Sequence, residues 1–316
     1  MANSAPGLPA GVDGRPATHA DLPAIDALFE ASERSLGVRP SSRSGYLEWR
    51  WSQPYVDVAS DTLAVIGDDG ELAGFGMGFV EPAQPTTLQA MGRVHPRHAG
   101  RGIGRSLLAF FADRGHTRPG VTSVRLGIAE SDRSGHALVA VGGYRRVRTS
   151  YDMGVELAGD ETPVEAPAGI TIRPFVSGDE EAVWRVEVES FRDHWDHEVD
   201  QPFDSFLSDR FADPVHPPRI SIAETGGEPV GICAWFVDDG VPYVFSVAVL
   251  RPHRGRGLAT ALLRATMADA AAAGYREVTL SVDATNPTGA LRVYEKVGME
   301  VHRALATYER RIAGGG

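Results

Sequence analysis

The sequence predicts an α/β fold with a mixed central sheet, built twice in tandem along the chain. Short segments of alternating polarity, such as "RISIAE" (219–224) and "REVTLSV" (276–282), are typical of half-buried strands. Longer segments with apolar residues at helical spacing, such as 179–191, alternate with these strands. A third observation is that several motifs occur twice, which predicts two copies of this arrangement.

The repeat is long enough to be a duplicated domain. Three pairs of residues lie 155 positions apart, namely His98 with His253, Gly102 with Gly257, and Gly143 with Gly298. Arg15 and Arg173 lie 158 positions apart, which indicates a small insertion between the matching blocks. We therefore expect a flexible N-terminus over 1–14, a first domain over 15–157, a linker over 158–169 and a second domain over 170–312.

The second copy shows the order of elements most clearly. Its expected strands are 169–175, 219–225, 229–237, 243–250, 277–284 and 301–311. Its expected helices are 179–191, 258–273 and 287–298, and a further helix stays open in the polar, aromatic region 192–219. Gly274 and Gly298 are expected to end the last two helices, because glycine readily adopts the left-handed conformation found there.

Composition excludes several classes of function. The chain has 316 residues and a net charge of −11, so it lacks the basic surface that a nucleic-acid partner requires. No apolar run reaches the roughly 20 residues that span a bilayer, and the N-terminus does not resemble a secretory signal. We expect a cytoplasmic protein without a metal site, either a monomer or a homodimer. The single cysteine, Cys233, lies in an apolar strand and is expected to be buried.

The stretch "HRGRGLATALL" (253–263) predicts an anion site. Gly255 and Gly257 permit a tight turn, and the helix that follows presents unpaired N–H groups and the positive end of its dipole. Arg254 and Arg256 add positive charge, so a pyrophosphate is the expected ligand. Neither the nucleotide P-loop pattern nor the dinucleotide-binding glycine pattern is present, which argues against ATP and NAD.

Two motifs of the second copy resemble those of the GCN5-related N-acetyltransferases, the GNAT family. The first, [Q/R]-x-x-G-x-[G/A], is matched by Arg254, Gly257 and Ala259. The second, N-x-x-x-A-x-x-x-Y-x-x-x-G-[F/M], is matched by Asn286, Ala290, Tyr294, Gly298 and Met299. The resemblance covers nearly the whole chain as two domains, an architecture similar to that of mycothiol synthases. It implies an N-acetyltransferase that uses acetyl-CoA as acyl donor.

The resemblance also implies roles for individual residues. Acetyl-CoA is expected between two diverging central strands, with its pyrophosphate on the backbone amides of Arg254, Gly255, Arg256, Gly257, Leu258, Ala259 and Thr260. A backbone N–H among Val247, Ala248 and Val249 is expected to polarise the acetyl carbonyl. Asn286 is expected to contact the pantetheine, and Tyr294 to act as general acid to the departing CoA thiolate.

The first copy departs from these motifs. It has Ala99, Ser131 and Val139 where the second copy has Arg254, Asn286 and Tyr294. We therefore expect the first domain to be non-catalytic, with Tyr144 as a core residue. Because it keeps Gly102 and Gly104, binding of CoA by the first domain and a purely supporting role both stay open.

The acceptor side is less defined by the sequence. Many members of the family carry a glutamate on the strand before the glycine loop, but here that strand has Tyr243 and no carboxylate, and Asp238 and Asp239 lie in a turn outside it. The segment 190–206 falls where this fold builds its acceptor wall, and its His194 and Glu198 are candidate bases.

We expect the acceptor to be a small-molecule primary amine. A free amino acid or its derivative, an aminoglycoside-like antibiotic, a peptide N-terminus and a pseudodisaccharide thiol precursor all stay open. So do N-terminal acetylation of peptides or proteins, and a regulatory or scaffolding role in which CoA binds without turnover.

Overall fold

The chain forms two compact units in the computed structural model, which describes residues 7–38, 44–162, 165–194, 197, 199–212, 217–238, 240–284 and 289–312. Unit 1 contains Met1–Thr149 and Arg303–Gly316, and unit 2 contains Ser150–His302. No helix in these described ranges is long and apolar enough to cross a membrane.

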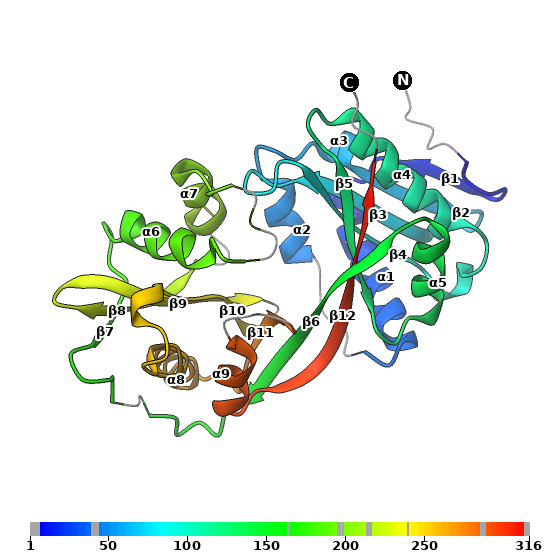
Figure 1. Ribbon diagram of the computed structural model, residues 1–316. Helices are drawn as coiled ribbons and strands as arrows, with labels where there is room; N and C mark the ends of the chain where they lie inside the picture. Colours follow the sequence, from blue (N-terminus) through cyan, green and yellow to red (C-terminus); the bar gives the residue numbers. More distant parts are fainter. Residues whose placement is uncertain are drawn as a thin grey trace. The chain divides into compact units, whose positions relative to one another are not determined.

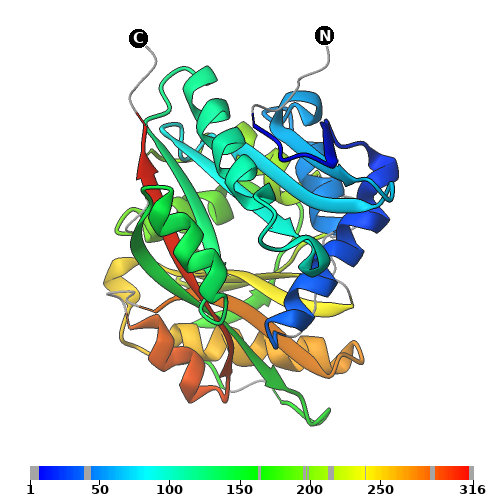
Figure 2. The ribbon, with the colours of Figure 1, turned by 90° about the vertical axis from the view of Figure 1, so that its right-hand side faces the viewer.

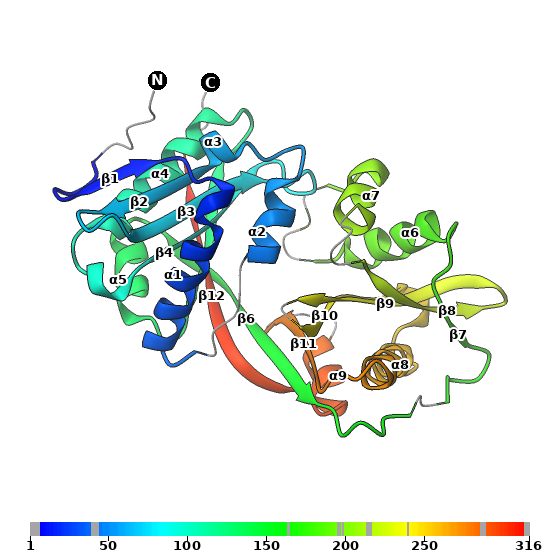
Figure 3. The same cartoon turned by 180° about the vertical axis from the view of Figure 1, so that it is seen from behind.

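Unit 1 is a sheet with helices on both faces (Figure 3). Its elements are β1 (Val12–Arg15), η1 (His19–Asp21), α1 (Leu22–Ser35), α2 (Ser44–Trp51), α3 (Val58–Asp61), β2 (Thr62–Gly67), β3 (Leu72–Val80), β4 (Thr87–Val94), η2 (Pro96–His98), α4 (Ile103–Thr117), β5 (Ser123–Ala129), α5 (Arg133–Val141) and the start of β6 (Arg145–Glu156). One core cluster joins α1 to the sheet and another joins α4 to it. The strand order is β1-β2-β3-β4-β5-β12.

Unit 2 repeats this arrangement, with α6 and α7 on one face of its sheet and α8 and α9 on the other (Figure 1). Its elements are β7 (Thr171–Pro174), α6 (Glu180–Phe191), α7 (Phe203–Phe211), β8 (Arg219–Thr225), β9 (Glu228–Asp238), β10 (Val241–Val249), η3 (Arg251–His253), α8 (Leu258–Ala272), β11 (Glu277–Asp283), α9 (Ala290–Lys296) and the start of β12 (Glu300–Arg311). The order β6-β11-β10-β9-β8-β7 contains one parallel pair, β10 with β11, so the predicted mixed sheet is confirmed.

The last strand of the chain belongs mainly to unit 1. Residues Leu305–Arg311 of β12 pair antiparallel with Ser123–Ala129 of β5, while Ser150–Glu156 of β6 pair with β11 in unit 2 (Figures 1 and 2). The compact units therefore divide the chain at different places from the sequence repeat. Alternating polarity identifies a segment as a strand, but it does not say which sheet edge the strand completes.

The duplication is visible in a matching ion pair near the start of each unit. Arg15 binds Asp21 through two hydrogen bonds of 2.7 Å, and Arg173 binds Asp179 through two of 2.6 and 2.9 Å. Each arginine thus ties the first strand of its unit to the start of the first helix. The hydrogen bonds from Arg15 hold the pKa of Asp21 at about 2.

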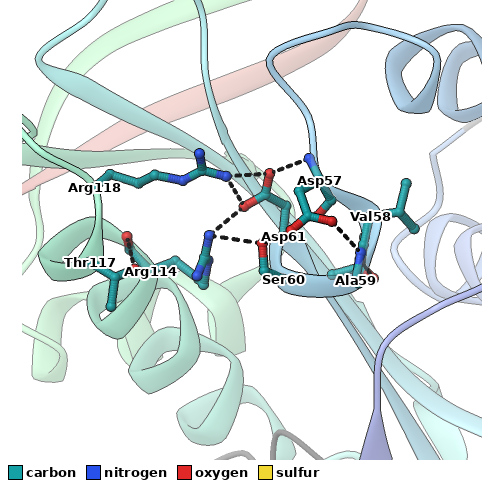
Figure 4. A network of polar contacts seen from close by, with 9 residues as sticks. Asp57, Val58, Ala59, Ser60, Asp61, Arg114, Thr117 and Arg118 are labelled. Carbon is teal, nitrogen blue, oxygen red and sulfur yellow. Dashed lines mark hydrogen bonds and ion pairs between the residues drawn. The ribbon is translucent and has the colours of Figure 1, made fainter.

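A buried carboxylate fixes the far end of α4 in unit 1. Asp61 is fully buried and accepts hydrogen bonds from Arg114 at 2.8 Å and from Arg118 at 2.6 and 2.7 Å (Figure 4). The amide of Asp57 donates to the same carboxylate at 2.9 Å. Both arginines also lie at the C-terminal end of α4, where a positive charge interacts favourably with the helix dipole.

Local predictions from single residues hold in unit 2. Gly274 and Gly298 have φ angles of 89° and 92°. Each lies directly after the C-cap residue of its helix, α8 or α9, as expected of a helix-ending glycine. Cys233 is fully buried, as predicted, and burial raises the pKa of its thiol to about 12. A thiol in that state is a packing residue and not a nucleophile.

Candidate functional site

The glycine loop of unit 2 joins β10 to α8 through left-handed residues. Gly255 and Gly257 have φ angles of 72° and 83°, which only glycine adopts without strain. The first hydrogen bond at this end of α8 runs from the amide of Ala261 to the carbonyl of Gly257 at 3.0 Å. The N–H groups of residues 258–260 therefore have no partner within the helix and are available to an anion.

Arg254 holds this loop in place through its side chain. Its Nε donates to the carbonyl of Val249 at 2.9 Å, and its Nη2 donates to the carbonyl of Ser190, near the end of α6, at 2.9 Å. Its own amide donates to the carbonyl of Arg251 at 3.3 Å. Asp193 pairs with both Arg251 and Arg254, and the hydrogen bond from Arg251 lowers the pKa of Asp193. The structure thus gives Arg254 an anchoring role that the sequence did not reveal.

The strand before the loop leaves its parallel neighbour. Pairing of β10 with β11 among the described residues is confined to Tyr243 with Thr279 and Val244 with Leu280. On the other edge, the register of β10 against β9 shifts between Val244 and Ser246, so Phe245 forms a β-bulge. The second half of β10, which contains the predicted residues 247–249, therefore has a backbone edge free for an extended ligand.

Tyr294 lies in the same core cluster as these elements. Its side chain is 8% exposed and packs in a cluster that includes Leu258 of α8, Val249 of β10 and Leu280 of β11. The structure therefore brings the predicted general acid, the start of α8 and the diverging strands together. Burial raises the pKa of the Tyr294 hydroxyl above its ordinary value, which keeps the hydroxyl protonated at neutral pH.

On the acceptor side the structure describes His194 but not Glu198. His194 lies in the turn after α6, where its amide donates to the carbonyl of Phe191 at 2.8 Å. It directly follows Asp193, which pairs with Arg251 of η3 and Arg254 of the loop. Three residues that the sequence singled out lie outside the described residues, namely Glu198, Asp239 and Asn286.

A polar and aromatic group on the α6 side of β10 was not predicted. Glu187 of α6 is buried and binds Arg210 of α7 at 2.9 Å, and the Arg210 guanidinium lies 4.8 Å from the centre of the Phe245 ring. The ring centre of Phe236 lies 5.6 Å from that of Phe245 and 5.7 Å from that of Tyr243. The hydrophobic pattern of a helix gives no signal for a buried glutamate. This group of residues could therefore be recognised only from the structure.

The corresponding place in unit 1 is built differently. β4 pairs with β3 in unbroken register from Gly74↔Val94 to Val80↔Leu88, without a bulge. Arg93 occupies the position of Ala248, and its guanidinium lies 5.2 Å from the Phe29 ring centre and donates to the carbonyl of Gly92.

The glycines and aromatic residues of unit 1 have structural explanations. Gly102 precedes α4 with a φ of 95°, while a β-carbon on Gly104 would lie 2.7 Å from Leu138, so close packing of α5 explains that glycine. Val139 and Tyr144 are buried in the core cluster. Among the residues that the structure describes, no group of three His, Cys, Asp or Glu side chains is placed to hold a metal ion.

Comparison with known proteins gives a consistent family. The sequence model of the acetyltransferase (GNAT) family matches residues 25–142 and 180–299, one match in each half of the chain. A protein named mycothiol acetyltransferase from Thermobispora bispora is 32% identical over 308 residues, which cover 93% of this chain and 97% of that protein. Its counterpart from Streptomyces avermitilis is 30% identical over 293 residues, with 90% of each chain covered.

Solved structures agree with this result. A GCN5-related N-acetyltransferase from Sphaerobacter thermophilus superimposes with a TM-score of 0.82 at 32% identity and covers 98% of both chains. A tandem GNAT protein from the clavulanic acid biosynthesis pathway shares the fold, with a TM-score of 0.73 at 19% identity. The chain therefore belongs to the acetyltransferase (GNAT) family, with two domains in tandem, and is an N-acetyltransferase that takes its acyl group from acetyl-CoA.

Proposed function

We propose that unit 2 transfers the acetyl group to a primary amine of a small molecule, and that unit 1 does not carry out transfer. The observation that carries this proposal is the arrangement around β10. Its bulge at Phe245, its divergence from β11, the start of α8 and the buried Tyr294 meet in unit 2. The relatives named mycothiol acetyltransferase support a small-molecule acceptor.

Residues of the loop and of β10 would hold the acyl donor. The N–H groups of residues 255–260 suit the two negative charges of the pyrophosphate, and the dipole of α8 adds to their attraction. The free edge of β10 suits the amide groups of the pantetheine arm, which would pair with it like an added strand. A backbone N–H of residues 247–249 would then hydrogen-bond the acetyl carbonyl oxygen and stabilise the negative charge that develops there.

Tyr294 would supply the proton for the leaving group. The amine nitrogen attacks the carbonyl carbon of the thioester, a C–N bond forms, the C–S bond breaks, and CoA leaves as a thiolate. Tyr294 donates its hydroxyl proton to that sulfur, and the proton released by the attacking nitrogen restores the balance through solvent. Its raised pKa ensures that the hydroxyl is present in its donating form.

The acceptor amine must be neutral to attack. β10 carries no carboxylate that could remove its proton, and His194, at the end of α6, is our candidate base on this side. An imidazole changes charge near neutral pH and can accept the proton directly or through water. Glu198 stays a second candidate from the sequence.

The proposal is tested by thiol release from acetyl-CoA in the presence of primary amines: amino acids, aminoglycosides, amino sugars and peptides. Product masses identify the acetylated amine. We expect at least one small amine to support release far above acetyl-CoA hydrolysis, and peptides to be poor acceptors. Binding of acetyl-CoA without release by any amine would instead favour the regulatory role, and a preference for peptides would favour N-terminal acetylation.

A further inference from the structure

Among the described residues, α6 and β10 each carry a buried hydroxyl group that has no hydrogen-bond partner. They belong to Ser190 of α6 and Ser246 of β10. Ser246 is only 3% exposed. A buried hydroxyl that has lost its hydrogen bonds to water without replacement is unfavourable, so a polar ligand that pairs with these two groups would remove that cost.

The two hydroxyl groups belong to elements that pack against each other, Ser190 to α6 and Ser246 to β10. Ser246 lies directly opposite Ala234 in the antiparallel pair, and opposite residues share a face of the sheet. Ala234 packs in a core cluster with Val183 and Val186 of α6. Ser246 therefore faces α6, the helix that carries Ser190.

Two arginine side chains connect α6 and β10 on either side of these groups. Arg254 links the carbonyl of Val249 to the carbonyl of Ser190. Arg210 links Glu187 to the ring of Phe245. The strip between these links, residues 245–249 on β10 and 187–190 on α6, thus contains both unpartnered hydroxyls, an aromatic ring and a buried ion pair. We call it the α6–β10 strip.

The position of the α6–β10 strip suits an attacking group. The bulge at Phe245 lies in it, next to the backbone that we assign to the acetyl carbonyl. Tyr294, by contrast, packs with α8 in the cluster that also contains Cys233. Cys233 lies opposite Val247 on β10, and the next residue, Ala248, packs in the cluster that contains α6. Because successive residues of a strand point to opposite faces, the cluster with Tyr294 and the cluster with α6 lie on opposite faces of the sheet. A nucleophile on the α6 face and a leaving sulfur near Tyr294 would lie on opposite sides of the thioester.

We propose that Ser190 and Ser246, in the α6–β10 strip, hydrogen-bond polar substituents of the acceptor and so determine which amines are acetylated. The acceptor class is then a primary amine that also carries hydroxyl or amide groups, in preference to a plain alkylamine. This inference rests on the proposed function and adds the chemistry of the acceptor. A subsite with buried hydroxyls discriminates strongly against a ligand that leaves them unpaired.

The test compares polar and apolar amines with matched enzyme variants. The polar amines are glucosamine, ethanolamine and glycinamide, and the apolar amines are cyclohexylamine and propylamine. In the unaltered protein we expect a higher kcat/KM for the polar set. Ser246→Ala and Ser190→Ala should each lower kcat/KM for polar amines roughly tenfold, the value of one hydrogen bond, with little change for apolar amines and in the Kd of CoA.

Thr266→Val is the matched control. Thr266 is also fully buried, but it lies on α8, which packs on the other face of the sheet, next to Cys233. Both serine variants should keep or raise the melting temperature, since each removes a hydroxyl that the free protein leaves unpaired. Only the serine variants should lose the preference for polar amines.

Several results would overturn the inference. One is an unaltered protein that acetylates both sets equally, and another is a serine variant that keeps the full preference, as expected if the hydroxyls bind only internal water. In both cases amine acetylation itself persists, so the proposed function stands. If acetyl-CoA binds but no amine of any kind is acetylated, the proposed function fails and this inference fails with it.

Discussion

The guanidinium of Arg254 donates a hydrogen bond to the backbone carbonyl of Ser190, 2.9 Å away and 64 positions earlier in the chain. The same side chain holds the carbonyl of Val249. The arginine of the family motif thus acts here as a connector between α6, the end of β10 and the glycine loop. Its planar group can make both bonds at once, which a lysine cannot do with the same geometry.

Arg254→Lys should therefore weaken CoA binding although it keeps the charge. We expect the Kd of CoA, measured by calorimetry, to rise about tenfold, which corresponds to the loss of one or two hydrogen bonds that position the loop. Arg256→Lys is the control, because it changes a neighbouring arginine in the same way. Equal losses in both variants would show that loop position is not what Arg254 provides.

Removal of the Tyr294 hydroxyl should affect chemistry more than binding. Tyr294→Phe keeps the buried ring and removes the proton donor, so we expect kcat for thiol release to fall roughly 10- to 1000-fold while the Kd of acetyl-CoA changes little. Tyr144→Phe is the matched control in unit 1, since Tyr144 is also buried and its hydroxyl has no partner among the described residues. Comparable losses of kcat in both variants would refute the assignment.

The dependence of rate on pH should reflect the pKa of the acceptor amine more than the pKa of Tyr294. Tyr294 acts in its protonated form, and burial raises its pKa, so the active form persists as pH increases. The amine acts in its neutral form, so kcat/KM should rise about tenfold per unit below the pKa of the amine. We expect no falling limb up to about pH 10. A fall in kcat/KM with an apparent pKa near 8 would assign the proton donor to another group.

The sequence predicted the strands of unit 2 and its helices α6, α8 and α9, because these depend on local patterns. Glycines at 255, 257, 274 and 298 have the left-handed conformation that their positions require. Tyr294 could be placed near the loop because its motif has a fixed spacing.

The parts that were not predicted depend on contacts between distant segments. Neither the bond from Arg254 to Ser190 nor the bulge at Phe245 leaves a local pattern, and the unpaired hydroxyl of Ser246 becomes evident only once its neighbours are known. The pairing of β12 with β5 has the same origin, since strand patterns do not encode partners.

The buried carboxylate of Asp61 should be important for the stability of unit 1 and unimportant for transfer. Asp61→Ala would leave Arg114 and Arg118 without their shared partner, and loss of one member of a buried ion pair costs about 3–5 kcal/mol. We expect a clear loss in the midpoint of denaturant unfolding. Asp57→Ala removes a more exposed carboxylate that caps α3, and its cost should be about 1 kcal/mol. If the two losses were equal, the arginine pairs would contribute little.

Truncation after His302 should unfold unit 1 selectively. It removes the part of β12 that pairs with β5, and with it Arg303 and Glu309, which neutralise the buried side chains of Glu33 and Arg125. Glu33 is only 2% exposed, so loss of the positive charge of Arg303 beside it would be strongly unfavourable in the folded unit. Unit 2, which consists of residues 150–302, keeps all of its own residues. Hydrogen exchange should therefore show lost protection in α1, β4 and β5 while β9, β10 and α8 stay protected. Equal loss of protection in both sets would mean that the fold of unit 2 depends on unit 1.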